Sequence, residues 1–492
     1  MIKQLLIIAA LGAPIAGSAT NFYITPDGNG AKDGTTWENA MGLAEFCDHM
    51  KFTFNSTPVN DSHTGEDYYF ATGTYTFTST IFVYRSGVSF NGGYDSATGQ
   101  PDTAARTIFD GDHKSRSNGA LFVQADSERN DDGKKRTFIV RDIDFTNFVT
   151  TGEWRGNDTN WQSGRPSAIY ITKCGYAEIT GCNFINNSCT GTGNNAMAGA
   201  LSLNKVNALV SRCSFIDNSG TDGGAIKLYY NVDGAWVKNV YLTVDRCYFT
   251  GNTSANNGGA IYGRNSMAVN IINTTITGNS ATSGGGIYSN APGNYDQIVN
   301  IVSSTIADNT ADNGSEVYTN GNGIVNTANS IIVATGDIIP MADATSTAGY
   351  TFLGNNLIGQ VAEGYTATAT DNIAADNNYS AVFGSNTLAA NGTLSPVSFH
   401  RGMAPGDIAS TVASQGWNYT VDTAVDQIGN ARYDDTCNGA LALDETNTGI
   451  DNVTVDNDNQ DTSWYNLQGI RFNSRPTAKG LYIHKGKKVL VY

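Results

Sequence analysis

A repeated segment between residues 182 and 318 constrains the fold of this chain more than any other sequence feature. In each of its five copies a Phe or Ile stands three positions before an asparagine, and a line of small residues follows after a polar turn. The intervals between the asparagines are 31, 34, 27 and 30 residues, and the five are Asn187, Asn218, Asn252, Asn279 and Asn309. A period of this size predicts an architecture of stacked repeats.

Each repeat can fold into short strands separated by turns, and each strand can pair in parallel with the same strand one coil further on. We therefore expect two stacks of inward side chains, one of Phe184, Phe215, Phe249, Ile276 and Ile306 and one of Leu201, Ile226, Ile261, Ile287 and Val317. Asparagine suits the turns because its side chain bonds nearby backbone and tolerates left-handed angles, and stacked asparagines form an amide ladder. The glycine pairs allow positive φ or close backbone approach. With the usual hand of parallel crossovers, the sequence predicts an all-β, right-handed parallel β-helix.

Composition supports a turn-rich β protein with a buried core, since the 492 residues include 55 Gly but 10 Pro and are 40% hydrophobic. The net charge of -16 disfavours nucleic acid and acidic lipid headgroups as partners.

Among seven cysteines, Cys182, Cys213 and Cys247 share one repeat position, which predicts an inward ladder. These thiols can be buried small side chains or can form disulfides in an exported protein, and no Cys-x-x-Cys pair favours a zinc site.

Residues 1–19 have the pattern of a secretory signal peptide. Lys3 precedes an apolar run from Leu5 to Leu11, and Gly17-Ser-Ala19 supplies small residues for cleavage. The apolar run is too short to span a bilayer, and no later stretch of the sequence is a candidate transmembrane segment. We expect export across the inner membrane, to the outer cell surface or the extracellular space.

The remaining chain divides into five regions. We expect an N-terminal cap at 20–65, because the open end of a solenoid needs a cover. Within the cap, Trp37 to Met50 is predicted to form a short amphipathic helix, since Ala40, Leu43 and Phe46 recur at helical spacing. The other regions are the coils of the β-helix at 66–335, wide coils with long loops at 336–446, an acidic linker at 447–463 and a small β module at 464–492.

The paired lines Phe-Ile-x-Asn and Gly-Gly-Ala-Ile-Tyr, over residues 140–335, resemble the repeats of polymorphic outer-membrane proteins and of bacterial right-handed parallel β-helix surface proteins. This resemblance implies the fold and a surface location, and it does not fix a ligand. Residues 336–446 are similar to the choice-of-anchor Q region, although Cys437-Asn-Gly-Ala440 departs from its Asp-Ile-Gly-Ala ending. That similarity implies a segment that closes the helix.

The module at 464–492 carries six basic residues and no acidic one. Three short strands are predicted in it, at Trp464 to Arg471, Lys479 to Ile483 and Gly486 to Tyr492. Its Tyr-x-Leu-x-Gly and Gly-x-Tyr-Ile elements are similar to those of the C-terminal sorting domain of type IX secretion cargo. The similarity implies passage across the outer membrane, with the secretion machinery as a partner, and leaves open whether the tail is removed or anchors the protein.

Hydrolysis of a glycosidic bond needs two carboxyl groups, and a lyase needs a base. Few residues in the sequence are candidates for these roles. They are Asp110, Asp112, His113, Asp142 and Asp144. The first three lie in the run Asp110-Gly-Asp112-His113, where the glycine between the acids indicates a tight turn as the alternative explanation. The other two alternate with Ile143, so we expect them on one face of a strand, where an exposed strand face is the alternative explanation.

The loop at 150–165 combines aromatic and charged residues in the pattern of a glycan-contact surface, and packing of the loop against the helix is the alternative. Its candidate ligand-binding residues are Glu153, Trp154, Asp158, Trp161 and Arg165.

No metal site is expected. Calcium could bind the turn acids Asp27 and Asp33 or the acidic run from Asp456 to Asp461, but turn and linker chemistry explains both.

Three functional hypotheses follow. The first is a non-enzymatic, adhesin-like or glycan-contacting surface protein whose partner is a polysaccharide or a host-cell glycan. It rests on an extended polar solenoid face and on the lack of a convincing catalytic set in the sequence. The second is a polysaccharide lyase or glycoside hydrolase, which requires acids from different coils to converge in a cleft. The third is a structural surface-layer component. Neither a cofactor nor nucleic-acid binding is expected.

Overall fold

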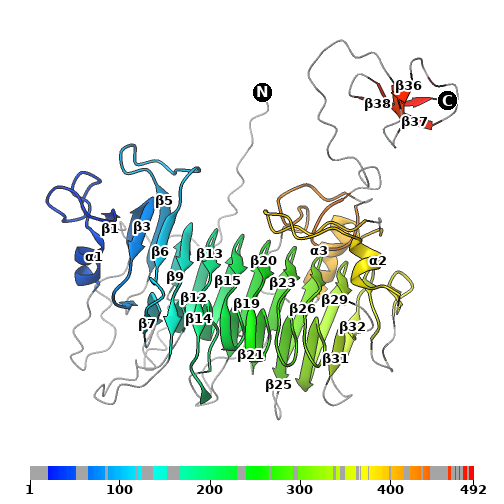
Figure 1. Ribbon diagram of the computed structural model, residues 1–492, viewed down its shortest axis with the longest axis horizontal. Coiled ribbons are helices and arrows are strands. Elements are labelled where there is room, and N and C mark those ends of the chain that lie inside the picture. Colours follow the sequence, from blue (N-terminus) through cyan, green and yellow to red (C-terminus); the bar gives the residue numbers. More distant parts are fainter. Residues whose placement is uncertain are drawn as a thin grey trace.

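The computed structural model describes residues 20–50, 65–83, 87–116, 119–124, 137–151, 167–193, 196–229, 240–264, 268–291, 297–335, 339–343, 349–361, 365, 367–374, 376–397, 400–414, 422–433, 436–443, 464–466, 471–472, 476, 480–484 and 487–491. These residues form a right-handed parallel β-helix with a helix at its N-terminal end and a separate small β module, as predicted (Figure 1). None of the described helices is long and apolar enough to cross a membrane.

The largest sheet of the described part, here sheet 1, has eighteen strands that pair in parallel with strands one coil away. Its strands are β1 (Thr20–Ile24), β2 (Glu66–Ala71), β4 (Ile81–Val83), β5 (Val88–Tyr94), β8 (Leu121–Gln124), β9 (Thr137–Arg141), β12 (Ile169–Thr180), β15 (Leu201–Ser211), β18 (Ile226–Tyr229), β19 (Tyr241–Asp245), β22 (Ile261–Arg264), β23 (Ala268–Ile272), β25 (Ile287–Ala291), β26 (Gln297–Val302), β28 (Val317–Gly321), β29 (Gly323–Ala328), β31 (Met341–Asp343) and β32 (Gly349–Phe352). The long strands β12 and β15 join two rows that elsewhere consist of separate shorter strands.

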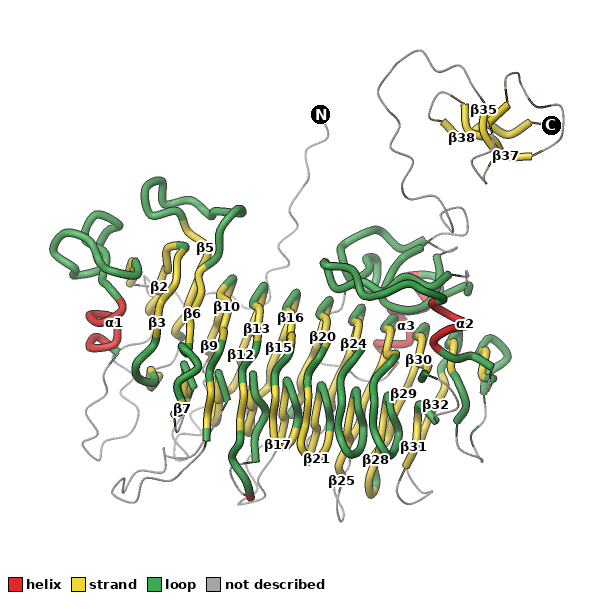
Figure 2. Tube along the Cα trace, in the orientation of Figure 1, coloured by secondary structure: helices red, strands yellow, loops and turns green. Residues whose placement is uncertain are grey.

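Two further parallel sheets complete the coils. Sheet 2 contains β3 (Gly73–Thr76), β6 (Thr107–Asp110), β10 (Ile143–Thr146), β13 (Asn183–Ile185), β16 (Ser214–Ile216), β20 (Tyr248–Thr250), β24 (Thr275–Thr277), β27 (Thr305–Ala307), β30 (Ile331–Val333), β33 (Leu357–Ile358) and β34 (Asn372–Ile373). Sheet 3 contains β7 (Ser115–Arg116), β11 (Val149–Thr150), β14 (Ser188–Cys189), β17 (Ser219–Asp222) and β21 (Thr253–Asn257). Figure 2 shows the strands of successive coils stacked side by side along the helix axis.

Both predicted stacks of inward side chains are confirmed by the register of the strands. In sheet 2, the central residue of each short strand faces the core, and the stack runs Phe184, Phe215, Phe249, Ile276 and Ile306, all fully buried. In sheet 1 the stack runs Leu201, Ile226, Ile261, Ile287 and Val317. Because side chains alternate along a strand, the residues on either side of each sheet 2 core position face outward.

The five repeat asparagines form a continuous buried amide ladder, as predicted. In the first four, Nδ2 donates to the Oδ1 of the asparagine one coil on, at 2.8 to 2.9 Å. The backbone N–H of each also donates to that Oδ1, at 2.9 to 3.1 Å. Glu316 ends the ladder, because its fully buried carboxyl accepts bonds from the backbone N–H and the Nδ2 of Asn309. Burial raises the pKa of Glu316 well above its usual value.

The left-handed backbone angle at this corner belongs to the residue before each asparagine, so our assignment of it to the asparagines is wrong. The residues with positive φ are Asn186, Asp217, Gly251, Gly278 and Asp308, with φ from 54° to 68°. This placement turns each asparagine side chain inward, where its Nδ2 donates to a carbonyl in the sheet 2 strand of the preceding coil, as Asn252 does to Phe215 O. The glycine pair has both expected roles. Gly258 has φ +69°, and a Cβ on Gly259 would lie 2.1 Å from Gly285 O.

The predicted cysteine ladder is present, and all its members are free thiols. Cys182, Cys213 and Cys247 are buried at the corner between sheets 1 and 2, and Cys213 N–H donates to Cys247 Sγ at 3.3 Å. Hydroxyl groups continue the ladder, because Cys247 N–H donates to Thr274 Oγ1 and Thr274 N–H to Ser304 Oγ. Burial raises the pKa of Cys182 and of Cys213 well above the usual value for a thiol.

The N-terminal end of the helix is covered by α1 (Leu43–His49), which is shorter than the helix predicted from Trp37 to Met50. Its Phe46 ring packs at 5.1 to 5.6 Å from the rings of Tyr68, Phe70 and Phe90. The residues before α1 pair with β1 instead, since Met41 bridges to Ile24 and Gly42 to Asp27. That pairing delays the start of the helix and leaves Trp37 in a turn, against the ring of Tyr23.

The C-terminal part of the β-helix departs from the wide coils that the sequence predicts. Beyond β34 the chain folds back along the outside of the coils (Figure 1). Two helices hold it there, α2 (Tyr379–Phe383) and α3 (Pro405–Ser414). Phe383 of α2 packs on outward residues of sheet 2 such as Ile331, and Ile408 of α3 packs on Val302 and Ala328. We call residues 376–443 the fold-back segment.

The module at 464–492 contains four antiparallel strands among its described residues, where three were predicted. They are β35 (Trp464–Asn466), β36 (Arg471–Phe472), β37 (Gly480–His484) and β38 (Lys487–Val491). The first predicted strand is divided into β35 and β36, which pair with each other as a hairpin.

Candidate ligand-binding cleft

The Asp110-Gly-Asp112-His113 run forms a tight turn at the end of β6. Asp112 and His113 have φ of 53° and 50°, and Asp110 Oδ1 accepts bonds from Asp112 N–H and from Asn147 Nδ2, both at 3.1 Å. Asp112 pairs with Lys114 at 2.5 Å, and this bond lowers the pKa of the Asp112 carboxyl. Asp112 and His113 are exposed, so the hydrogen bonds of the turn account for this run of residues.

Asp142 and Asp144 do not share one exposed strand face, so that expectation is corrected. Asp142 occupies the corner before β10 with φ 56°, whereas Asp144 lies on β10 and is 7% exposed. The carboxylate of Asp144 accepts bonds from Arg106 Nη2 and from Asn183 Nδ2, both at 2.7 Å. Arg106 also lies 4.0 Å from Asp142. Burial raises the pKa of Asp142, and Arg106 opposes that shift.

The other predicted positions contribute no described site. Glu153, Trp154, Asp158, Trp161 and Arg165 lie outside the described residues, as does the acidic run from Asp456 to Asp461. Asp33 accepts bonds from the N–H and the hydroxyl of Thr35, which is ordinary turn chemistry. In the described part of the chain, no three His, Cys, Asp or Glu residues are close enough to hold a metal ion.

A row of polar side chains runs along the outer face of sheet 2. The register places Asp144, Asn183, Ser214 and Tyr248 at one outward position in four successive coils. Asn183 donates to Asp144, and Ser214 Oγ donates to Asn183 Oδ1 at 2.5 Å. Strand pairing spaces these groups about 4.8 Å apart. The helix therefore presents a regular line of hydrogen-bonding groups parallel to its axis.

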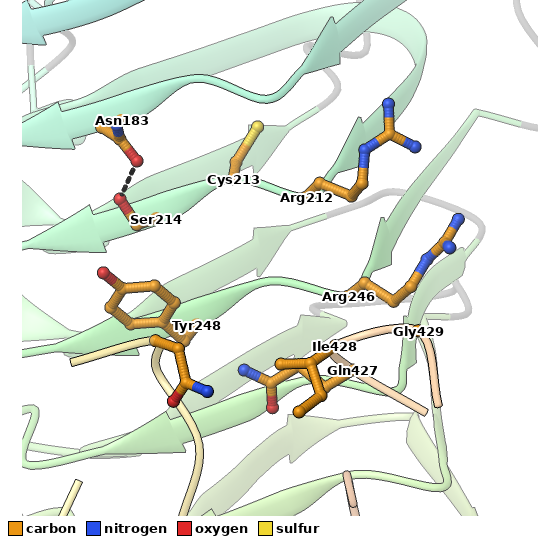
Figure 3. Close-up of a pocket in the computed structure, with 10 residues that line it drawn as sticks. Asn183, Arg212, Cys213, Ser214, Arg246, Tyr248, Gln427, Ile428 and Gly429 are labelled. Atoms are coloured by element: carbon orange, nitrogen blue, oxygen red, sulfur yellow. Dashed lines mark hydrogen bonds between the residues drawn. The ribbon is translucent and has the colours of Figure 1, made fainter. Parts of the chain in front are cut away.

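The fold-back segment closes one end of this row and forms a cleft. Gln427 links it to the coils, because its Oε1 accepts a bond from Thr275 Oγ1 at 2.6 Å and its Nε2 donates to Gly392 O at 2.7 Å. Gly392 lies against Tyr248, where a Cβ would approach ring atom Cδ1 to 2.1 Å. The cleft has a volume of about 300 Å³ and is lined by Asn183, Arg212, Cys213, Ser214, Arg246, Tyr248, Asn391, Gln427, Ile428 and Gly429 (Figure 3).

Two arginines form the rim of the cleft. Arg212 and Arg246 occupy the same corner between sheets 1 and 2 in successive coils, with φ of 51° and 54°. Figure 3 shows their side chains extending side by side in the same direction. Arg246 Nε donates to Asp245 at 3.1 Å, and Asp245 is 1% exposed. Burial raises the pKa of that carboxyl, although Arg246 acts in the opposite direction.

Arg212 differs from Arg246 because it is exposed and makes no side-chain hydrogen bond or ion pair with any described residue. The lining of the cleft thus combines guanidinium, amide and hydroxyl groups with one tyrosine ring and includes no carboxylate. Such a surface can donate hydrogen bonds to oxygen atoms and bind negative charge. It holds neither of the carboxyl groups that a glycosidase places on its substrate.

Sequence reasoning did not identify these cleft residues. One signal was available, since Arg212-Cys213 and Arg246-Cys247 repeat an arginine before the inward cysteine. The contribution of Asn391 and Gln427 carries no such signal, because these residues reach the cleft only when the chain folds back.

Comparison with known proteins supports the repeat. The model of the Chlamydia polymorphic membrane protein repeat matches residues 246–264, which confirms the resemblance for that repeat. No curated protein matches the chain significantly. The resemblances of 336–446 to a choice-of-anchor Q region and of 464–492 to a type IX sorting domain stay predictions.

Three solved structures are similar to the chain. Pectate lyase Pel9A is 12% identical with a TM-score of 0.31, over 87% of this chain and 97% of that one. The A-module of the Azotobacter vinelandii mannuronan C-5 epimerase AlgE6 is 12% identical with a TM-score of 0.30, over 63% and 89%. A mannuronic acid specific polysaccharide family 6 lyase from human gut microbiota is 9% identical with a TM-score of 0.25, over 72% and 90%. At these scores the three structures carry no argument about the cleft.

Proposed function

We propose that this chain is an exported, cell-surface or secreted protein that binds a polysaccharide along the outer face of sheet 2 in a non-enzymatic, adhesin-like role. The observation that carries the proposal is the cleft that the fold-back segment makes with the coils, at the end of the row from Asp144 to Tyr248. The match of residues 246–264 to a repeat of membrane surface proteins supports the location.

The row suits a linear polysaccharide because both are periodic. Polar groups recur about every 4.8 Å along the helix axis, a spacing comparable with one sugar unit of an extended chain. Each coil can then meet one sugar with an amide, a hydroxyl or an aromatic ring. Tyr248 is half-buried, so its ring is held in place while part of it stays accessible. Rigid aromatic rings beside a few placed polar groups are typical of ligand sites.

The carboxyl groups near the row favour binding over cleavage. Asp144 is bound to Arg106 and Asn183, and Asp245 is buried against Arg246. A glycosidase needs one carboxyl that is free to donate a proton and a second that acts as base or nucleophile. Both of these carboxylates are instead held in hydrogen bonds with the protein.

Binding assays on the full chain test the proposal. A glycan array selects a polysaccharide, and titration calorimetry measures its dissociation constant for the wild type and for Tyr248→Ala. We expect Tyr248→Ala to weaken binding by about fivefold or more, since an aromatic contact contributes ~1 kcal/mol. Tyr433, which is 63% exposed on the fold-back segment, supplies the matched control Tyr433→Ala. Equal effects of the two substitutions, or no glycan bound by the wild type, would contradict the proposal.

One observation favours polysaccharide cleavage as a second candidate function. Asp142 has a raised pKa and lies beside Arg106, which binds Asp144. Two carboxyl groups in different environments can divide acid and base roles. Release of oligosaccharides from the selected polymer by the wild type, lost in Asp142→Asn, would establish this function in place of simple binding.

A further inference from the structure

The charge of the cleft is opposite to that of the whole chain. The chain has a net charge of -16, yet the charged residues that line the cleft are two arginines and no acid. Asp245 forms an ion pair with Arg246, while Arg212 is exposed and forms no ion pair with a described residue. A local positive site on an anionic protein attracts anions and excludes cations.

The two arginines are also placed to act together. They occupy equivalent corners of adjacent coils, so their backbones are about 4.8 Å apart, and their side chains extend in parallel. Asp245 fixes the orientation of Arg246 through Nε, and neither Nη atom of Arg246 donates to a described residue. Two parallel guanidinium groups on adjacent coils repel each other. An anion between them would replace that repulsion with two charge-assisted contacts.

We propose that the cleft binds an acidic polysaccharide, with a carboxylate or sulfate group of one sugar held between Arg212 and Arg246 and its ring near Tyr248. This inference rests on the proposed function and names its ligand class. Guanidinium groups match the planar, two-oxygen geometry of such anions and bind them in a bidentate manner. Gln427 and Asn391 supply the amide groups that meet sugar hydroxyls beside the anionic group.

The two ends of the row carry different charged groups. Asp144 and Asp142 lie at the far end from the fold-back segment, with Arg106 between their carboxyl groups. The arginine rim is at the near end. Arg106 is already bound to Asp144, so the guanidinium groups available to an anionic sugar group are those of Arg212 and Arg246, which places that group at the cleft.

The test is calorimetric titration of the full chain with three polymers: a polyuronate, a sulfated polysaccharide, and the same polyuronate with its carboxyl groups reduced to alcohols. We expect reduction to weaken binding by about tenfold or more, because a hydrogen bond to a charged group is lost. Whichever anionic polymer binds more tightly identifies carboxylate or sulfate as the recognised group. Binding of the anionic polymer should also weaken as salt is raised.

Arg212→Gln is the decisive variant, because Arg212 is exposed and its loss leaves no buried group unpaired. We expect it to weaken binding of the anionic polymer about tenfold and to leave binding of the reduced polymer unchanged. Arg246→Lys keeps a cation beside Asp245 and should weaken anionic binding severalfold through loss of the bidentate contact. Arg264→Gln is the control. It removes an exposed arginine from sheet 1 and should change neither the binding of the anionic polymer nor that of the reduced polymer.

These measurements distinguish failure of the anionic-ligand inference from failure of the proposed polysaccharide binding. If the reduced polymer binds as tightly as the polyuronate, or if Arg212→Gln affects both equally, the anionic assignment is overturned while polysaccharide binding stands. If the wild type binds none of the three polymers and no glycan on the array, the proposed function falls and the inference falls with it.

Discussion

Removal of one asparagine from the buried ladder tests how the coils are held together. Asn252 is fully buried, and its Oδ1 accepts from the backbone N–H of Asn218 at 3.0 Å and from Asn218 Nδ2 at 2.9 Å. Its Nδ2 donates to Phe215 O at 2.9 Å and to Asn279 Oδ1 at 2.8 Å. Asn252→Ala removes these four bonds and a longer one, from Nδ2 to Thr250 O at 3.2 Å.

The magnitude follows from the groups left without partners. The backbone N–H of Asn218 loses its acceptor, Phe215 O loses a donor, and two amides lose one bond each. A buried polar group without a partner costs about 1 to 3 kcal/mol, so we expect Asn252→Ala to lower the free energy of unfolding by about 3 to 5 kcal/mol. That loss is a large part of the ~5 to 15 kcal/mol that stabilises a typical domain.

Urea unfolding followed by circular dichroism measures this loss. The matched control is Asn256→Ala, since Asn256 is an exposed residue of β21 in the same coil and its side chain donates to Asp222 at 3.1 Å. We expect the control to change the free energy of unfolding by less than ~0.5 kcal/mol. If the two variants unfold at the same urea concentration, the ladder does not stabilise the coils and this reasoning is refuted.

Two further predictions concern buried groups of the coils. Because the pKa of Glu316 is raised in the folded state, its contribution to stability is complete below the unfolded value of about 4.3 and is lost as pH rises toward the folded value. The free energy of unfolding of Glu316→Gln relative to the wild type, measured by urea unfolding, should therefore increase from pH 4.5 to pH 8, and a flat difference would contradict the burial. Cys213→Ser should cost less than ~1.5 kcal/mol because hydroxyl groups already occupy the same ladder at Thr274 and Ser304, and a thiol reagent should not label Cys213 without denaturant. Rapid labelling of Cys213 in the native protein would be the contrary result.

The repeat made the coils predictable because strand register and core packing are both periodic. One Phe or Ile per repeat marks the position that faces inward, and alternation along the strand then gives the direction of the neighbouring side chains. Even in the coils, the sequence did not show which turn residue has the left-handed backbone angle. A turn can place its left-handed residue at the asparagine or just before it, and the carbonyl that Asn252 must reach decides in favour of the earlier position.

The cleft was harder to predict because it joins segments far apart in the sequence. Gln427 meets Thr275 across 152 residues, and Arg432 donates to Asn273 across 159. No period relates these positions, and the apolar residues that dock the fold-back segment, such as Phe383, could equally belong to a coil. Asp144 shows the same limit, since its strand position was foreseen but its bond to Arg106 was not.

Hydrogen exchange with and without a bound acidic polysaccharide tests the central claim most directly, because it reports where on the chain the ligand lies. We expect slower exchange, on binding, in peptides that contain β13, β16 and β20 and in the peptide around Gln427. Peptides that contain Arg212 and Arg246 should also exchange more slowly on binding. Protection confined to other parts of the chain, such as α1 or the outer face of sheet 1, would contradict the assignment of this cleft as the binding site.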